Sequence, residues 1–270
     1  MIDLHCHLLP GIDDGAENLE AAIQMARIAV ADGIHTVACT PHIYPGLYPN
    51  TGPAIRRAVE LFREQLASAG IPLTITCGAD IHLTPDLVSG LDSGALPSLH
   101  GSRYFLLEPP HHVAPPQLEE TVFGLATAGY VPVITHPERL IWIEDYYDLF
   151  PRLVKGGAWL QVTAGSLTGH FGAAAQYWGE RLLDEGLVHL LATDAHGVNN
   201  RPPVLSKGYQ AAARWVGPEE ADHLVKTRPS AILDDLNPAQ TPLLPAAVNT
   251  TSTHALLPRV SFIHRLFRHR

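Results

Sequence analysis

The sequence predicts an α/β protein built around a mostly parallel sheet. Short apolar runs alternate with stretches of helical periodicity along the first 238 residues, which is the pattern of repeated βα units. Glycines also stand where the helices are expected to end, at Gly33, Gly70, Gly129 and Gly186. Together these observations divide the chain into strand and helix units.

The seven predicted strands are spaced so that a helix fits between most of them. In chain order they cover residues 2–4, 36–39, 73–77, 104–107, 131–135, 159–162 and 188–192. Helical periodicity is clearest over residues 19–31 and 54–69, where apolar side chains recur every three or four positions. We therefore expect helices over both ranges and one folded domain over residues 1–238.

The composition changes after residue 238. Residues 239–258 are rich in proline, which is typical of a linker, and residues 259–270 combine apolar side chains with four arginines. At helical spacing this tail would be a short amphipathic segment for peripheral contact with an anionic membrane or a membrane-bound partner. The alternative is a disordered end whose composition has no function.

Charge and cysteine content narrow the class of protein. The 270 residues carry a net charge of −9, and residues 1–238 alone have 14 basic against 27 acidic side chains, a net −13. A domain with this much negative charge does not bind the phosphate backbone of nucleic acid by non-specific electrostatic attraction. It can, however, bind cations. Three cysteines are too few for a disulfide framework. With no leader-like segment and no apolar span of about 20 residues, we predict a cytoplasmic protein.

Side chains of metal-ligand type stand at the carboxyl ends of six of the seven predicted strands. They are His5, His7 and the following Asp14, then His42, Asp80, Glu108, His136, Asp194 and His196. In a parallel α/β barrel these ends form one face, where active sites lie. Imidazole nitrogens with carboxylate oxygens suit Mn, Fe or Zn. The pattern predicts a catalytic metal cluster, with Asp13 orienting a ligand, although an isolated His5-x-His7 pair is equally typical of a half-exposed strand.

The remaining histidines and the cysteines lie off this pattern. The histidines that are poor ligand candidates are His100, His111, His112, His170, His189, His223 and those of the tail. His35 and His82 lie near strand boundaries but at the wrong positions, and we expect them to be surface or packed residues. A cysteine phosphatase needs an arginine six positions after its nucleophile. Cys6, Cys39 and Cys77 are followed there by Ile12, Pro45 and Leu83. Thiolate chemistry is therefore excluded.

The motifs in combination resemble the bacterial PHP (polymerase and histidinol phosphatase) family, and within it the capsular and exopolysaccharide-type protein-tyrosine phosphatases. The matching segments are MIDLHCHLLPGIDDG at 1–15, TPH at 40–42, GADI at 78–81, Glu108, THPER at 135–139 and TDAHGVNNR at 193–201. The resemblance covers about residues 1–236. It implies a distorted (β/α)7 TIM-like barrel with two or three metal ions, most often Mn²⁺, with Fe or Zn as alternatives.

The same resemblance implies how the ligands are shared. The first ion is bound by His5, His7 and Asp194. A second ion is bound by His136, with residue 80 and Glu108 bridging to it or completing its ligand set. The third ion is bound by Asp14, His42 and His196. The family typically has glutamate at position 80, whereas this chain has Asp80. Its reach is shorter by one methylene, about 1.5 Å. The number of ions and the preferred metal at the bridged site therefore remain open.

The activity implied by the resemblance is hydrolysis of phosphotyrosine by a metal-activated water. Arg139 and Arg201 offer planar guanidinium groups for the substrate phosphate. The alternatives are that Arg139 pairs with Glu138 or caps the following helix, and that Arg201 lies at the surface. The implied partner is a membrane-associated bacterial tyrosine autokinase that controls polysaccharide export, and an oligomer is compatible with the sequence. The residues that could pack against the phenyl ring of the substrate are Tyr44, Tyr48, Trp142 and Tyr177. The alternative is that these side chains belong to the core.

Two other functions stay open from the sequence. The first is another phosphoesterase activity of the PHP family, of the histidinol phosphatase or the nucleotide and exonuclease type, because fold and metals do not fix the leaving group. The second is a non-catalytic regulator that binds metal without turnover, since the shorter Asp80 alters the site.

Overall fold

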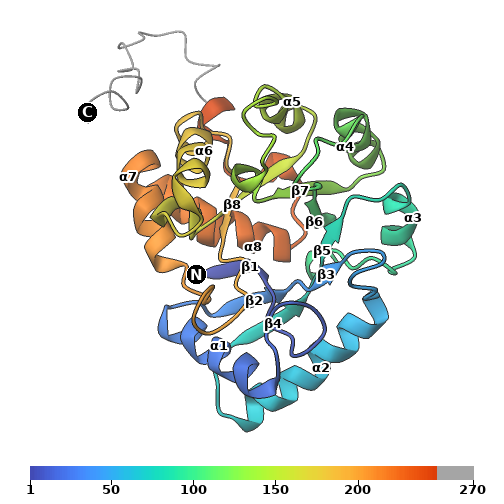
Figure 1. The fold of residues 1–270 in the computed structure, drawn as a ribbon, viewed down its shortest axis with the longest axis vertical. Coiled ribbons are helices and arrows are strands. Elements are labelled where there is room, and N and C mark those ends of the chain that lie inside the picture. The colour runs from blue at the N-terminus through green and yellow to red at the C-terminus, as the bar shows by residue number, and fades with distance from the viewer. Residues whose placement is uncertain (248–270) are drawn as a thin grey trace.

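The computed structural model describes residues 1–247 and places parallel strands among surrounding helices (Figure 1). The strands are β1 (Ile2–Cys6), β2 (Thr36–Cys39), β3 (His42–Ile43), β4 (Thr74–Cys77), β5 (Asp80–His82), β6 (Tyr104–Glu108), β7 (Val131–Thr135), β8 (Trp159–Thr163) and β9 (Leu190–Ala192). The helices are α1 (Leu19–Ala31), α2 (Gly52–Ser68), α3 (Leu87–Asp92), α4 (Leu118–Thr127), α5 (Leu149–Lys155), α6 (Gly172–Asp184), α7 (Ser206–Asp222) and α8 (Arg228–Leu233). The predicted α/β alternation is confirmed, including helices close to both predicted ranges.

The paired strands are all parallel and form two sheets in the described chain. One has the order β1-β2-β4 and the other β3-β5-β6-β7-β8-β9. The short strands β3 and β5 were not predicted, because each continues a predicted strand after a two-residue break. Pro41 in the first break has no N–H to donate to a ladder. In the second, a Cβ on Gly78 would lie 2.9 Å from the Leu99 side chain and 3.0 Å from that of Thr40.

Backbone hydrogen bonds link the two sheets at their carboxyl ends. Beside β1, the Asp194 N–H donates to the His5 carbonyl (2.8 Å) and the His7 N–H to the Ala195 carbonyl (2.9 Å). Beside β5, the Asp80 N–H donates to the Pro41 carbonyl (3.1 Å). Residues from β1, β5 and the segment after β9 are thereby held at one end of the sheets.

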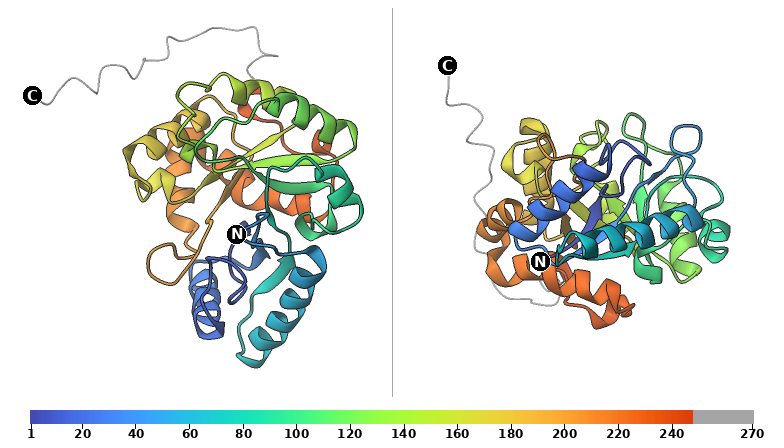
Figure 2. Two further views of the ribbon diagram at one scale, coloured as in Figure 1. Left: turned by 45° about the vertical axis from the view of Figure 1, so that its right-hand side comes forward. Right: turned by 90° about the horizontal axis from the view of Figure 1, so that it is seen from below.

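The core has two layers. The larger packs the helices against the outer faces of the strands, and the predicted helix ends at Gly33, Gly70, Gly129 and Gly186 all have positive φ. The smaller layer lies between strands and includes Ile2, Leu4, Tyr104, Val131, Trp159 and Leu190. Ile232 of α8 joins this smaller layer, and the last helices run beside the N-terminus in Figure 2. Thus α8 covers the amino ends of the strands, opposite the predicted site.

The described chain continues past the predicted domain boundary. Arg228 donates to the carbonyls of Pro242 and Leu243, and Leu244 is buried. The division at residue 238 stays a prediction, and the tail at 259–270, with much of the linker at 239–258, lies outside the described residues. No helix within residues 1–247 has both the length and the apolar character needed to cross a membrane.

Candidate metal centre

The carboxyl ends of the strands bring all nine predicted metal ligands together. Each belongs to a group of three or four side chains whose ligand atoms lie within 4.8 Å of one another. The groups are His7, Asp14, His42 and His196; His5, His7 and Asp80; His5, His136 and Asp194; His42, Asp80 and Glu108; and Glu108, His111 and His136. The groups share members, so the nine side chains and His111 form one continuous cluster. Their service as metal ligands is a proposal developed below.

The separations inside the cluster fit side chains that share ions. His5 Nε2 lies 3.3 Å from Asp194 Oδ1 and 3.4 Å from Asp80 Oδ2, and His42 Nδ1 lies 3.5 Å from Glu108 Oε2. Two ligand atoms that are each about 2.1 Å from one ion stand about 3.0 to 3.4 Å apart. The separations in the cluster are therefore close to those of ligands that share one ion.

Asp80 is the strongest single indication of a missing partner. Its side chain is fully buried, and neither Oδ1 nor Oδ2 has a hydrogen-bond partner among the described residues. The Nδ1 atoms of His42 and His136 are likewise buried without a hydrogen-bond partner among the described residues. Buried polar groups are normally satisfied, because leaving one unpaired costs about 1 to 3 kcal/mol. A cation bound by these side chains would remove that cost, so the residues present fit a metal centre.

Two histidines of the cluster are held in the neutral form. Burial, together with the positive charge of Arg139, lowers the pKa of His136 to about 4. Burial, together with His7, lowers the pKa of His196 to about 3. A neutral imidazole is the form that binds a metal ion.

The carboxylates of the cluster are held in the ionised form. Burial opposes the charge on Asp80 and on Asp194, but the neighbouring His5 outweighs it and both pKa values lie well below their usual range. Burial likewise opposes charge on His5, but Asp194 and Asp80 raise the pKa of His5 to about 9. Without a metal ion, the protonated imidazole of His5 balances the charge of these two carboxylates. A divalent cation bound between them would balance the same charge.

Side chains behind the cluster orient its histidines. Asp13 Oδ2 accepts from Nδ1 of His7 (2.7 Å), as predicted for Asp13, and Gln161 Oε1 accepts from Nδ1 of His5 (2.7 Å). Each bond leaves Nε2 of its histidine free to face the cluster, which is how carboxylates and amides commonly support metal-binding histidines. Gln161 lies on β8, the one strand with no predicted ligand, so the sequence pattern missed it.

Another buried carboxylate, that of Asp3, links β1 to the residue after β9 by hydrogen bonds. It accepts from the N–H of Thr193 (3.0 Å) and of His5 (3.3 Å), and from the Thr193 hydroxyl. Burial raises the pKa of Asp3 to about 6. The sequence signal was an acid within an apolar strand, two residues before His5.

Arg139 and Arg201 meet at the edge of the cluster. Both guanidinium groups form ion pairs with Oδ2 of Asp194, whose Oδ1 faces His5. The ring of Phe171 supports both, with its centroid 4.3 Å from Cζ of Arg139 and 5.5 Å from Cζ of Arg201. The alternative pairing of Arg139 with Glu138 does not occur, because Glu138 accepts from the Thr163 N–H and the Ser166 hydroxyl. The surface alternative for Arg201 is also wrong.

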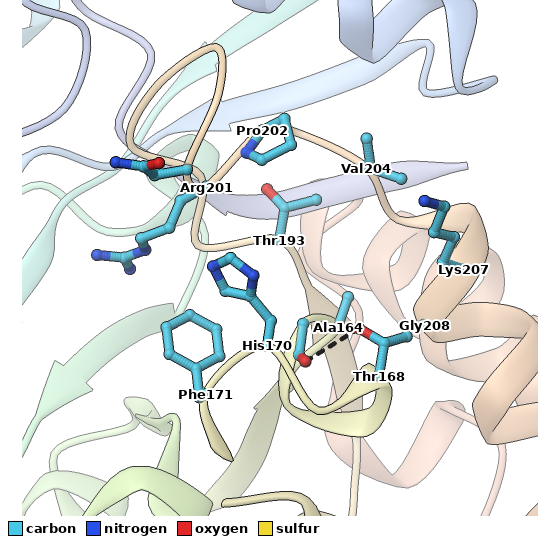
Figure 3. A pocket seen from close by; sticks show the side chains of 12 residues that line it. Ala164, Thr168, His170, Phe171, Thr193, Arg201, Pro202, Val204, Lys207 and Gly208 are labelled. Carbon is cyan, nitrogen blue, oxygen red and sulfur yellow. Dashed lines mark hydrogen bonds between the residues drawn. The ribbon is translucent and has the colours of Figure 1, made fainter.

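Arg201 retains an unused donor. Its Nε is buried and has no hydrogen-bond partner among the described residues. Arg201 also lines a pocket of about 160 Å³ together with His170, Phe171 and Lys207 (Figure 3). The side of the cluster beyond Asp194 therefore offers positive charge and free donors, which suit an anion.

The aromatic candidates separate into two kinds. Tyr48 stacks on His42 with centroids 5.5 Å apart, and Tyr44 stacks on His82 at 3.9 Å. Trp142 is instead buried and donates from Nε1 to the Pro110 carbonyl (2.8 Å), so it is a structural residue. Tyr177 is exposed and packs against Trp178.

Two histidines that the pattern set aside lie beside the cluster. His111 Nε2 is 3.5 Å from Glu108 Oε1, and His82 Nδ1 is 3.8 Å from Glu108 Oε2. His111 was set aside as a poor candidate, and its membership of a ligand group corrects that prediction. His82 belongs to none of the ligand groups among the described residues and packs against Tyr44, as expected for a packed residue. His111 follows β6 by three residues in a loop whose path the sequence does not specify. The cysteines behave as expected, since burial raises the pKa of Cys6, Cys39 and Cys77 above the usual thiol range.

Comparisons with known proteins agree with this geometry. The family described as capsular polysaccharide synthesis, CpsB/CapC, matches residues 1–234. The chain is 40% identical to the tyrosine-protein phosphatase YwqE of Bacillus subtilis over 201 residues, which are 74% of this chain and 79% of the relative. It is 28% identical to the tyrosine-protein phosphatase CpsB of Streptococcus pneumoniae over 87% of this chain and 99% of that protein.

Solved structures give the same result. A crystal structure from work on YwqE of Bacillus subtilis and CpsB of Streptococcus pneumoniae, described as metal-dependent tyrosine phosphatases, superposes with a TM-score of 0.86 at 34% identity, covering 91% of this chain and 98% of that one. A histidinol phosphate phosphatase from Lactococcus lactis superposes with a TM-score of 0.51 at 12% identity, covering 82% and 93% of the two chains. The second match shows a shared fold alone.

Proposed function

The chain belongs to the CpsB/CapC family of capsular polysaccharide synthesis, and we propose that it is a metal-dependent protein-tyrosine phosphatase acting in that process. The observation that carries the proposal is Asp80, a fully buried carboxylate without a hydrogen-bond partner among the described residues, at the centre of the histidine and carboxylate cluster. The relatives at 31% and 40% identity are named as tyrosine-protein phosphatases, and they support the same assignment.

The proposed ligand sets follow the three predicted groups. His5, His7 and Asp194 hold one ion, and Asp14, His42 and His196 hold another, while Asp80 and Glu108 serve a third with His136. We propose Mn²⁺ as the metal, with Fe or Zn as alternatives, because mixed imidazole and carboxylate donors suit these ions. When bound, such ions lower the pKa of a coordinated water toward neutrality and neutralise phosphoryl oxygens.

The chain's own part in catalysis is to bind and orient the phosphate. Arg139 and Arg201 use only some of their N–H donors on Asp194, and the buried Nε of Arg201 has no acceptor in the described chain. These donors bind the phosphoryl oxygens and stabilise the charge that develops during transfer. Phe171 keeps both guanidinium groups in place through its ring.

Tyr48 is the proposed contact for the substrate phenyl ring, since it stacks on His42 beside the cluster. Its replacement by alanine is expected to raise KM for phosphotyrosine peptides about 3- to 10-fold while kcat changes little, because one aromatic contact contributes about 0.5 to 1.5 kcal/mol. The measurement is steady-state kinetics with a phosphotyrosine peptide. Unchanged KM would remove Tyr48 from substrate binding.

The finer assignments extend this proposal. We propose that the substrate is a phosphotyrosine protein, namely a membrane-associated bacterial tyrosine kinase, and that the domain of residues 1–238 acts in the cytoplasm with the tail as a peripheral membrane contact. We also propose a distorted (β/α)7 barrel in which β2 with β3, and β4 with β5, count as single interrupted strands. The bridge between Cys6 and Ala195 supports closure beside β1.

The test is hydrolysis of p-nitrophenyl phosphate and a phosphotyrosine peptide by chelator-stripped protein, with Mn²⁺, Zn²⁺, Mg²⁺ and Fe²⁺ added back separately. We expect restoration by at least one metal, resistance to thiol alkylation, and loss of activity in His136→Ala but not in His112→Ala, an exposed matched control. Metal binding without hydrolysis of either compound would favour a non-catalytic regulator. Selective cleavage of histidinol phosphate or nucleotides would favour another PHP phosphoesterase.

A further inference from the structure

His111 stands where a metal ligand is needed beside Glu108. Its Nε2 lies 3.5 Å from Glu108 Oε1, and Nε2 of His136 lies 3.8 Å from the same oxygen. The rings of His111 and His136 have centroids 5.0 Å apart. One ligand atom from each of Glu108, His111 and His136 therefore lies within 4.8 Å of the other two.

The loop that carries His111 is fixed. Trp142 donates from Nε1 to the Pro110 carbonyl (2.8 Å), and the Ile141 N–H donates to the His111 carbonyl (3.2 Å). Trp142 is itself buried and stacked on Phe150 with an interplanar angle of 12°. A side chain on so anchored a backbone is positioned for coordination, as a metal ligand must be.

Asp80 lies as close to His136 as Glu108 does. Its Oδ2 is 3.8 Å from Nε2 of His136, the same separation as that between Nε2 of His136 and Oε1 of Glu108. Asp80 also shares one ligand group with His5 and another with Glu108. An ion between Glu108 and His136 therefore has two or three protein ligands from the predicted set, and a coordination number of four or more allows a further imidazole.

We infer that His111 is a further protein ligand of the ion held by Glu108 and His136. This inference rests on the proposed function only in requiring that the cluster bind metal. Two imidazoles and one carboxylate make this site richer in nitrogen than an all-carboxylate site, so it takes Zn²⁺ or Fe²⁺ in preference to Mg²⁺.

The experiment compares metal binding by the full chain and its His111→Ala, His111→Gln and His112→Ala variants. His112 is the adjacent exposed histidine of the same loop. Chelator-stripped proteins are titrated with Zn²⁺ and with Mn²⁺, bound metal is measured after equilibrium dialysis, and Co²⁺ absorption spectra report the nitrogen ligands. We expect one ion to bind at least 10-fold more weakly in both His111 variants, with a changed Co²⁺ spectrum, and no change in His112→Ala.

The possible outcomes distinguish this inference from the proposed function. His111 variants that bind every ion as tightly as His112→Ala would overturn the inference while leaving the phosphatase proposal intact. Loss of one ion in these variants, with no phosphotyrosine hydrolysis by the parent, would uphold the inference and overturn the phosphatase proposal. Absence of any metal binding by the parent would overturn both.

Discussion

Two buried polar clusters lie at opposite ends of the strands, and they differ in how their groups are satisfied. At the amino ends, the fully buried Arg228 donates to both carboxylate oxygens of Glu220 (2.7 and 3.2 Å) and to two backbone carbonyls. His189 accepts there from the Leu160 N–H (3.1 Å) and stacks on Trp159. At the carboxyl ends, Asp80 lies beside histidines, but neither of its carboxylate oxygens has a hydrogen-bond partner within the described chain.

This difference separates structural polar groups from functional ones. A buried polar group that is satisfied inside the protein stabilises one fold and needs nothing else. A buried group left without a hydrogen-bond partner lowers the free energy of unfolding until a ligand binds it, and the ligand proposed here is a cation. Burial and charge alone would not have distinguished the two clusters.

The largest expected effect is on catalysis at the carboxyl ends. Asp194→Asn should lower kcat/KM for p-nitrophenyl phosphate about 10³-fold or more, since Asp194 joins the histidine cluster to both arginines. The measurement is steady-state kinetics at saturating metal. Asp235→Asn is the matched control, because Asp235 also pairs with an arginine, Arg103 (2.9 Å), and also has positive φ. Retention of a tenth of the activity by Asp194→Asn would contradict the proposed role.

The amino-end cluster should respond in stability and not in chemistry. Arg228→Ala is expected to lower the free energy of unfolding by about 3 kcal/mol, because it leaves Glu220 and two carbonyls without their donor. Urea unfolding with and without metal measures this, and added metal should not restore the loss. If the alanine variant does not fold, Arg228→Lys should show a smaller loss in the same direction. A change below 1 kcal/mol would show that this cluster is not a structural unit.

Removal of metal should destabilise the carboxyl ends alone. Each ion present at 100 times its dissociation constant contributes about 2.7 kcal/mol, so a chelator should lower Tm of the parent protein by several degrees. The chelator should lower Tm of His136→Ala by less than it lowers Tm of the parent. It should lower Tm of His189→Asn, at the amino ends of the strands, by as much as that of the parent. Calorimetry with and without chelator measures all three. Equal shifts for the two variants would remove the distinction between the clusters.

Much of the fold was predictable because its signals are local. Apolar runs, helical spacing and the glycines after helices each act within a few residues, and they placed β2 and β7 at their observed bounds and α1 over residues 19–31. The breaks that create β3 and β5 depend on close approach between strands, as at Gly78. No local pattern carries that information.

The site was predictable where a side chain of metal-ligand type stands at or soon after the carboxyl end of a strand. Eight side chains met this rule, and together with Asp14 of the loop after β1 they all lie in the cluster. Gln161 and His111 did not, for different reasons. Gln161 points inward from the middle of β8 to orient His5, and a glutamine in a strand has no distinctive signal. His111 lies in a loop whose position is set by hydrogen bonds from Ile141 and Trp142, 30 or more residues later in the chain.

The smallest expected effect is the pH dependence of the amino-end cluster. Burial and the charge of Arg228 hold the pKa of His189 well below its usual value near 6.5. Below pH 6.5 the unfolded chain takes up a proton at this residue and the folded protein does not. His189 therefore stabilises the fold fully above pH 6.5, and its contribution falls by up to about 1.4 kcal/mol per pH unit as the solution becomes more acidic.

His189→Asn keeps an acceptor for the Leu160 N–H and removes the titrating group. Between pH 7.5 and 5.5, with chelator present, the parent should lose about 1 kcal/mol more of its free energy of unfolding than this variant does. His112→Asn, at an exposed histidine, should match the parent. The histidines of the carboxyl-end cluster titrate equally in all three proteins, so the difference isolates His189. An identical pH slope for the parent and His189→Asn would show that the amino-end cluster takes up a proton after all, and the contrast between the two ends would then be one of degree.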